Sequence, residues 1–294
     1  MMRLGAPFAA EVFAAEAYDP VALAKGHRAK GYRAAYCPNI SLKDPAHIRA
    51  VETAFASEDV LIAELHGLVS WEKAGNLIDP DLEQRAAWHE HLCERFALAD
   101  EVGARCFLEM PGTFDPNSFY MPHPKNLTDE CQDMIVQRVR EVIDAVRPRR
   151  TKFALEMMPF IHPSDSDSYV ALQKAIDRES FGVHLDPANI MNSPDRCFNN
   201  GKLIKECFEK LGPSILSCHV KDVNLVPGAF PLGIEHCRAG TGLMDFRTYL
   251  CELNRLPPDT PIMSEPISSL SERDYDLARD HLIAVAHGAG LSFL

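Results

Sequence analysis

The chain alternates between short apolar runs and longer segments in which apolar residues recur with the helical period. Eight of the short runs have the composition of strands buried on both faces of a parallel sheet, where apolar and β-branched side chains dominate. These predicted strands are Arg3–Phe8, Gly31–Cys37, Asp59–Leu68, Ala104–Met110, Thr151–Met158, Phe181–Asp186, Ser214–Lys221 and Thr260–Glu265.

The segments between the predicted strands carry signals for the start and the end of helices. Asp44 before Pro45, and Asp79 before Pro80, each predict an N-cap followed by proline at the first helical position. Gly103 predicts the end of the helix that follows the second pair, because glycine readily adopts the left-handed conformation found there. Further predicted helices are Thr128–Val146, Asn200–Leu211, Asp245–Leu256 and Ser271–His287.

This alternation predicts a closed barrel. Eight strands separated by helices in 294 residues are typical of an α/β fold of the (β/α)₈ or TIM-barrel type, here spanning residues 1–294 as a single domain. The alternative is a doubly wound open sheet, which usually has a glycine-rich turn after its first strand. The segment from Leu4 to Phe8 contains a single glycine, so the sequence favours the barrel.

Composition and charge narrow the function classes. The formal net charge is −12, from 30 Lys and Arg against 42 Asp and Glu. Phosphate backbones are bound mainly by Lys and Arg, so this balance disfavours a nucleic-acid partner. No apolar run approaches the ~20 residues of a membrane span. Glu11 and Glu16 interrupt the alanine-rich N-terminus, where a signal peptide would need a continuous apolar stretch.

The nine cysteines are scattered, and no pair has the two-residue spacing of a zinc or redox motif. Such a pattern predicts reduced thiols and therefore a cytoplasmic location.

Three predicted strands end in a carboxylate with a proline close behind it. Proline comes directly after Asp186 and Glu265, and three residues after Glu156. Because proline cannot donate to a sheet, these acids mark the C-terminal ends of their strands, where TIM-barrel active sites lie. His219 occupies a similar place in the seventh predicted strand.

Three acids at one barrel mouth would repel one another, and burying an unpaired carboxylate costs several kcal/mol. One divalent metal ion would relieve both problems. Three carboxylates and one imidazole suit Mn²⁺ or Mg²⁺ first, with Co²⁺ or Zn²⁺ as alternatives. The competing interpretation is that each acid pairs with an arginine or lysine of the barrel. The sequence therefore predicts one metal ion held by Glu156, Asp186, His219 and Glu265.

At these residues the sequence resembles the xylose-isomerase-like TIM barrel superfamily of sugar phosphate isomerases and epimerases. Its relatives there would be ketose 3-epimerases, hydroxypyruvate isomerase and inosose isomerases or dehydratases. The resemblance implies one metal ion on the four residues, with Glu156 and Glu265 also acting as catalytic acid and base. The motifs that carry it are Leu155-Glu156, His184-Leu185-Asp186-Pro187-Ala188-Asn189, His219-Val220-Lys221-Asp222 and Ser264-Glu265-Pro266.

A further segment, Gly240 to Phe246, resembles the glycine turn of the superfamily, and a simple loop followed by an Asp245 N-cap explains it equally well. Three positions depart from the superfamily pattern. Asn189 stands where both the epimerase and the endonuclease IV branches have a histidine, and Glu109 stands where the nuclease branch has another. Leu225 replaces an arginine of the epimerases. These departures argue against a nuclease with three metal ions and leave the substrate open.

Six further polar residues are candidate substrate contacts. His66 and Glu109 lie near the ends of the third and fourth predicted strands, with a role in the barrel wall as the alternative. His184 lies one layer below Asp186, which favours a supporting or core role over a ligand. Lys221 either reaches substrate oxygens or forms a salt bridge with one of the acids. The six candidates are His66, Glu109, His184, Asn189, Lys221 and Arg238.

Two long segments, Pro111–Asn126 and Val223–Thr241, are predicted loops on the active-site face, and loops of this length are usually functional. Their aromatic residues suit either sugar packing or contacts in a homo-oligomer. Gly240, Gly242 and Ser268–Ser271 are the candidates for a phosphate site, which TIM barrels often build from their last two loops.

Together these features predict a metal-dependent isomerase or epimerase of a small keto sugar or keto polyol, acting through an enediolate. One alternative is a lyase that eliminates a β-leaving group from a keto-inositol or 3-keto glycoside, with His162, His184 or His236 as the acid. Another alternative, from a different class, is a non-catalytic sugar-binding barrel.

Overall fold

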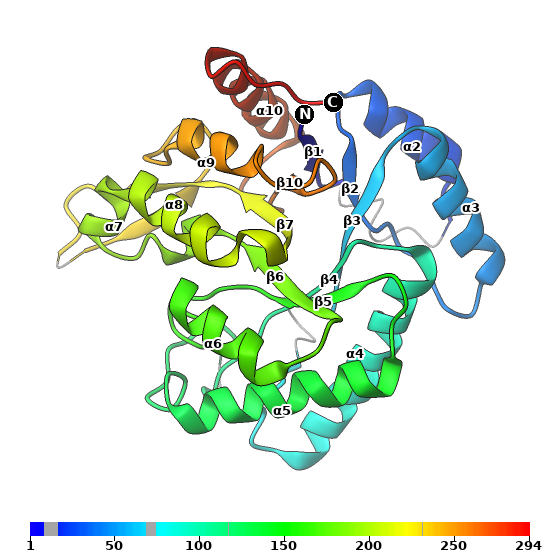
Figure 1. The fold of residues 1–294 in the computed structure, drawn as a ribbon, viewed down its shortest axis with the longest axis vertical. Helices are drawn as coiled ribbons and strands as arrows, with labels where there is room; N and C mark the ends of the chain where they lie inside the picture. The colour runs from blue at the N-terminus through cyan, green and yellow to red at the C-terminus, as the bar shows by residue number, and fades with distance from the viewer. Residues whose placement is uncertain (9–16, 69–74, 117, 231) are drawn as a thin grey trace.

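The fold is a closed barrel of parallel strands. The computed structural model describes residues 1–8, 17–68, 75–116, 118–230 and 232–294, so Glu11 and Glu16 lie outside the described residues. Within them, the barrel strands follow the order β1-β10-β7-β6-β5-β4-β3-β2 (Figure 1). They are β1 (Arg3–Ala6), β2 (Ala34–Tyr36), β3 (Leu61–His66), β4 (Cys106–Glu109), β5 (Lys152–Leu155), β6 (Phe181–Leu185), β7 (Ile215–Val220) and β10 (Pro261–Ser264). The predicted TIM barrel is confirmed, and each strand lies within its predicted run.

Helices surround the barrel (Figure 1) and cover its outer face with apolar side chains. On that face the ring of Phe96 stacks on Phe107 of β4, with 5.0 Å between centroids. Cys106 and Leu108 of the same strand point the other way, into a cluster inside the barrel. The helices are α2 (Pro20–Ala29), α3 (Pro45–Ser57), α4 (Leu82–Val102), α5 (Asp129–Val146), α6 (Ser166–Ile176), α7 (Pro194–Phe198), α8 (Asn200–Leu211), α9 (Phe246–Leu253) and α10 (Glu272–Gly288).

Most of the helix ends follow their predicted signals. Asp44 caps α3, and Gly103 ends α4 with a φ of 73°. The predicted start of α4 at Asp79 is wrong, because α4 begins at Leu82 with Asp81 as its N-cap. The Asp81 carboxylate accepts hydrogen bonds from two backbone amides of the first turn, whereas Asp79 accepts from the amide of Asp81 in the preceding turn. Two aspartates compete for the capping role here, and the one nearer the helix takes it.

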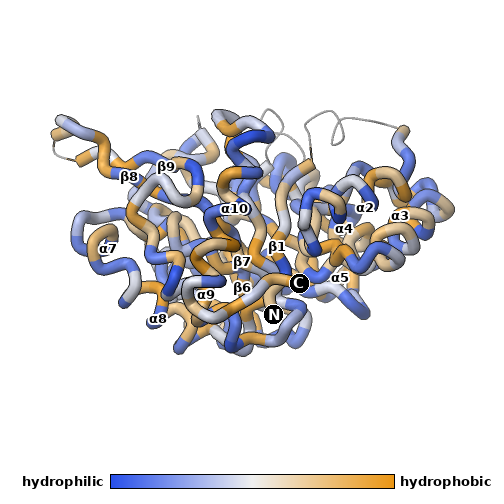
Figure 2. Tube along the Cα trace, turned by 90° about the horizontal axis from the view of Figure 1, so that it is seen from above, coloured by the Kyte–Doolittle hydropathy of each residue, from blue (hydrophilic) through white to orange (hydrophobic). Residues whose placement is uncertain are grey.

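The segment Val223–Thr241 is a correction to the predicted loop. It contains most of an antiparallel hairpin formed by β8 (Asp222–Leu225) and β9 (Ile234–Cys237). Figure 2 shows this hairpin projecting from the body of the molecule beyond α7. Each strand has four residues, which is too short for the alternation of side chains to stand out in the sequence.

The glycine turn after the hairpin is built around a buried carboxylate. Asp222 accepts hydrogen bonds from the amides of Gly240 at 3.1 Å, Gly242 at 2.9 Å and Met244 at 2.9 Å. A Cβ atom at Gly242 would lie 2.4 Å from Asp222 Oδ1, so only glycine fits there. Asp245 then caps α9, as the sequence predicts.

Among the described residues, no helix combines the length and the apolar character that crossing a membrane requires.

Candidate active site

The four predicted metal ligands meet at the C-terminal mouth of the barrel. Glu156, Asp186 and Glu265 directly follow β5, β6 and β10, and His219 lies in β7. One ligand atom of each lies within 4.8 Å of the others. The distances from His219 Nδ1 are 3.8 Å to Glu156 Oε1, and 3.9 Å to both Asp186 Oδ2 and Glu265 Oε2. We call these four residues the quartet.

The geometry of the quartet fits a cation. His219 Nδ1 is buried and forms no hydrogen bond with any described residue, although three carboxylate oxygens surround it. A cation at ~2.0–2.3 Å from each ligand atom holds neighbouring ligand atoms about 3–4 Å apart. That range includes the spacing around His219. Three carboxylates with one imidazole are also a donor set that Mn²⁺ and Mg²⁺ accept.

Lys221 adds a positive charge to the edge of the quartet. Its side chain is buried, and its ammonium lies 2.8 Å from Asp186 Oδ2 and also contacts Glu265 Oε2. Burial opposes the ionisation of Asp186, but Lys221 and His219 outweigh it and hold the pKa of this carboxyl below its usual range. Of the two predicted roles of Lys221, the structure therefore shows the salt bridge with the acids.

The two glutamates of the quartet differ in their affinity for protons. Burial raises the pKa of Glu156, but contact with His219 and the charge of Lys221 outweigh it, so the net pKa is lowered. At Glu265 burial dominates over the attraction of Lys221, and the charges of Asp186 and Glu156 add to it, so the pKa is raised to about 7. Carboxyl groups whose pKa values are pushed apart in this way are typical of acid–base pairs.

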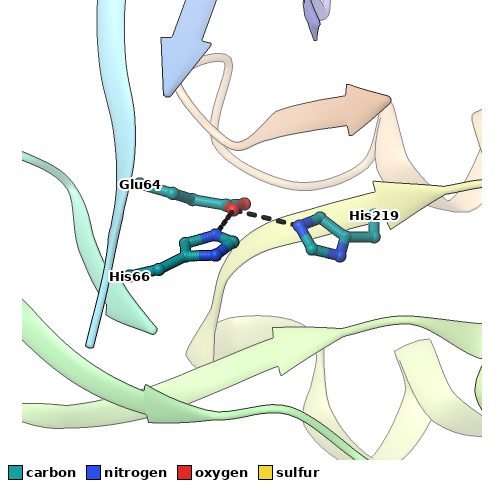
Figure 3. A group of neighbouring side chains, drawn as sticks. All are labelled: Glu64, His66 and His219. Atoms are coloured by element: carbon teal, nitrogen blue, oxygen red, sulfur yellow. Dashed lines mark hydrogen bonds and ion pairs between the residues drawn. The ribbon is translucent and has the colours of Figure 1, made fainter. Parts of the chain in front are cut away.

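A fourth carboxylate, Glu64 of β3, lies beneath the quartet and contacts His219. It is fully buried, and its Oε2 accepts a hydrogen bond from Nε2 of His66 and another from Nε2 of His219, each at 3.0 Å (Figure 3). Its Oε1 accepts from the Ser217 hydroxyl and lies 3.5 Å from His184 Nε2. Burial alone would raise the pKa of Glu64, but His219 and the hydrogen bonds from the histidines hold it well below the usual range.

Three more side chains pack around this network. His184 is fully buried and meets the His219 ring edge-on, with 4.1 Å between centroids. The Tyr36 hydroxyl lies 3.2 Å from His219 Nε2 and donates to the backbone oxygen of Ser264. Asn189 donates a hydrogen bond to Glu156 Oε1 at 2.8 Å. His184 and Asn189 therefore support quartet residues in the structure.

Glu109 and Arg238 lie apart from the quartet. Glu109 shares the outer face of β4 with Phe107, and its carboxylate packs on Gly67, where a Cβ atom would lie 1.9 Å from Glu109 Oε2. It faces α4, beside Trp88, rather than the inside of the barrel. Arg238 points toward the start of α10, 3.7 Å from Asp274. Neither residue is placed to meet a substrate on the quartet.

A cleft of about 820 Å³ opens beside Glu265. The Glu265 side chain is 22% exposed, so it joins the buried quartet to this space. Tyr120, from the segment after β4, and His236, from β9, line the same cleft. Burial and the charge of Lys221 lower the pKa of His236, while burial and the nearby charges of Glu156 and Glu265 raise that of Tyr120.

A family model described as xylose isomerase-like TIM barrel matches residues 30–284. The chain belongs to this family. Among curated proteins, it is 25% identical over 191 residues to the uncharacterized protein YihM of Escherichia coli strain K12. That match covers 65% of this chain and 52% of YihM, so it spans about half the length of the curated relative.

Several solved structures resemble this xylose isomerase-like barrel. A xylose isomerase-like TIM barrel protein from Mycobacterium smegmatis, in complex with magnesium, is 17% identical with a TM-score of 0.66, over 98% of this chain and 97% of that chain. D-psicose 3-epimerase from Clostridium cellulolyticum H10, with D-tagatose, is 15% identical with a TM-score of 0.65, over 99% and 100%. Endonuclease IV from Thermus thermophilus is 14% identical with a TM-score of 0.70, over 98% and 100%. At these identities the likeness shows the fold.

Within this xylose isomerase-like barrel, the strand-end pattern did not reveal the whole network. Glu64 carried a signal, since it is the one charge in the apolar run Leu61–Leu65. Tyr36 and Ser217 are ordinary residue types for a barrel strand. Their roles depend on partners from other strands, which a single sequence does not pair.

Proposed function

We propose that this protein is a divalent-metal-dependent isomerase or epimerase of a keto sugar or keto polyol. The observation that carries the proposal is the quartet itself, in which Glu156 and Glu265 flank one cation-shaped site and bind protons with different affinity. Structural neighbours that include D-psicose 3-epimerase support the same class.

The residues of the quartet divide the work. Asp186 and His219 would hold and orient the metal ion, while Glu156 and Glu265 move protons at the carbon beside the substrate carbonyl. When bound, the metal ion supplies Lewis-acid polarisation of that carbonyl and a template for the neighbouring hydroxyl. Glu265, with a pKa of about 7, accepts or returns a proton at neutral pH. Glu156, kept anionic and fixed by Asn189, serves the other face or the neighbouring carbon.

Glu64 acts as a positioning residue in this proposal. Because it accepts the Nε2 hydrogen of His219, it leaves Nδ1 of the same ring to face the three carboxylates. The same oxygen holds His66 at the end of β3, where the ring keeps 32% of its surface exposed toward the mouth. One carboxylate thus orients one histidine for the metal ion and another for the substrate.

Solvent exchange tests the reaction class. Metal-loaded protein incubated in D₂O with candidate keto sugars is expected to place deuterium on the carbon beside the carbonyl, as followed by NMR. Glu156→Gln and Glu265→Gln variants that retain metal are expected to lose interconversion by about 10²–10⁴-fold. Turnover with no deuterium from solvent would contradict the proposal and indicate hydride transfer.

A lyase is the second candidate, and the position of His236 is the observation that favours it. This histidine lines the cleft beside Glu265, within electrostatic reach of Lys221, Asp186 and Glu156. A lyase would release a leaving group and an enone in the same experiment, whereas an isomerase or epimerase would yield only isomeric sugars.

Metal affinity tests the role of Glu64. Replacing a group that orients a ligand histidine typically weakens metal binding about 10–100-fold. We therefore expect Glu64→Gln to weaken Mn²⁺ binding by that factor in calorimetric titration. Glu109→Gln removes another buried carboxylate that does not touch the quartet, and it should bind Mn²⁺ as the unaltered protein does. Equal affinities in all three proteins would remove Glu64 from the site.

A further inference from the structure

The cleft beside Glu265 extends beyond the quartet and is lined mainly by residues outside it. From Glu265 it runs outward between α2 and the first turns of α10, past Leu23 and Gly26 on one side and Tyr275 on the other. Its volume of about 820 Å³ lies in the upper part of the range of roughly 300–1,000 Å³ that accommodates drug-sized ligands. A single sugar ring held on the quartet would fill the inner end and leave the outer part free for a substituent.

The charged groups of the lining do not favour an anionic substituent. Among the described residues, the lining carboxylates are those of Glu265, Glu272 and Asp276, and the lining cation is Lys30. Each of these charges already has a partner, since Lys30 lies 3.5 Å from Glu272, Asp276 lies 2.8 Å from Arg279, and Glu265 contacts Lys221. Burial lowers the pKa of both lining histidines, His236 and His27, to about 4 in the case of His27. A phosphorylated substrate would therefore find no unpaired cation among the described lining residues.

Several of the backbone amides that could bind a phosphate already donate to protein oxygens. Asp222 accepts from the amides of Gly240 and Gly242, so a carboxylate occupies the place that a phosphate would take in that turn. At the start of α10, Ser271 and Asp274 form a capping box, and Glu272 adds a second acid to the first turn. Acids at a helix N-terminus take up the amides and the positive end of the dipole that would otherwise attract an anion.

The remaining lining is apolar and aromatic. Leu23 and Gly26 lie three residues apart on α2, so they belong to one face of that helix. Tyr275 contributes an aromatic ring from α10 opposite them, and Leu270 lies beside it. Surfaces of this kind suit the faces of sugar rings and aryl groups.

We infer that the substrate is an unphosphorylated keto sugar with a large neutral substituent, a keto glycoside, whose substituent lies in the cleft between α2 and α10. This inference rests on the proposed function, because it assumes that the keto sugar ring binds at the quartet. It adds the size and the charge of the substrate, and it assigns a second, non-reacting end of the site to α2 and α10.

A substrate panel tests the inference directly. The panel contains 3-keto-glucose, its methyl, phenyl and glucosyl glycosides, and 3-keto-glucose 6-phosphate. Solvent exchange and turnover are measured with the metal-loaded full chain. We expect kcat/KM for the phenyl or glucosyl glycoside to exceed that for the free sugar at least tenfold, and the phosphate to be the poorest substrate.

A variant of the cleft separates this inference from the proposed function. A Cβ atom at Gly26 would meet no atom within 4 Å, so a phenylalanine there can start without a clash and extend into the outer cleft. It should lower kcat/KM for the phenyl glycoside at least tenfold and leave the free keto sugar within about twofold. Gly288→Phe, at an equally open position at the end of α10 and outside the cleft lining, should change neither.

Several results would overturn the inference while leaving the proposed function intact. One is faster solvent exchange with 3-keto-glucose 6-phosphate than with the glycosides. Another is equal rates for the free sugar and all its glycosides. A third is a Gly26→Phe variant that turns over the phenyl glycoside and the free sugar as the unaltered protein does. No exchange with any member of the panel would overturn the proposed function together with the inference.

Discussion

Two buried glutamates on neighbouring strands, Glu64 of β3 and Glu109 of β4, have opposite chemistry. Both are at most 2% exposed. Glu64 faces the inside of the barrel, where two histidines and a serine donate to it, and its pKa is far below the usual range. Glu109 faces α4, where neither oxygen has a hydrogen-bond partner of good geometry among the described residues, and burial raises its pKa to about 8.

The difference shows that donors, rather than burial, decide the charge of an acid inside this barrel. Desolvation pushes both pKa values upward, and at Glu109 it outweighs the Trp88 indole, the Met110 amide and the charge of Arg95, which oppose it. Around Glu64 the donors come from β3 and β7 together, and one of them, His219, belongs to the quartet. We therefore expect Glu64 to be ionised and essential to the site, and Glu109 to be protonated at neutral pH and dispensable for it.

The largest effect should come from removing the charge of Glu64. Glu64→Gln leaves the buried His219 without its anionic partner, and breaking a buried ion pair typically costs about 3–5 kcal/mol. We expect the free energy of unfolding at pH 7, from urea denaturation, to fall by that amount. Glu109→Gln removes no ion pair and should lose no more than about 1 kcal/mol at this pH. Similar losses in both variants would abolish the distinction between the two sites.

The pH dependence of stability should respond to Glu109. Its pKa is raised on folding, so its contribution to stability is complete below the usual carboxyl pKa and is lost as the pH rises through about 8. Even half of that shift corresponds to about 2 kcal/mol. Glu109→Gln should therefore gain about 2 kcal/mol relative to the unaltered protein between pH 5 and pH 9, in paired urea titrations. Parallel curves would mean that Glu109 is ionised and paired.

The smallest effect should come from a single neutral donor to Glu64. Ser217→Ala removes one hydroxyl and leaves both histidines on the carboxylate, and such a hydrogen bond typically contributes about 0.5–1.5 kcal/mol. Mn²⁺ affinity, measured by calorimetry, should change by less than about threefold. A loss as large as that of Glu64→Gln would place the serine, rather than the histidines, at the centre of the network.

Local signals in the sequence were sufficient for the barrel and for the four residues at its mouth. Strands buried on both sides give apolar runs of a recognisable length, and a proline behind Asp186 or Glu265 marks where the run stops. The hairpin of β8 and β9 was not predicted from the sequence because its strands are short. The start of α4 was misplaced because Asp79 and Asp81 both suit a cap.

Alternation along β4 places Glu109 on the same face as Phe107, but it does not indicate which face lies inward. In a parallel barrel both faces of a strand are apolar, so alternation cannot tell the interior from the helix-covered exterior.

The sequence by itself determined where the strands end and which polar side chains stand at those ends, because both follow from residues adjacent in the chain. Only the tertiary structure decided which acid is charged, since that depends on donors brought from far away. Glu64 and His219 are 155 positions apart, and Lys221 and Glu265 are 44 apart. Closing the barrel brings them within hydrogen-bond distance, and at that distance in a dry interior each partner sets the protonation of the other.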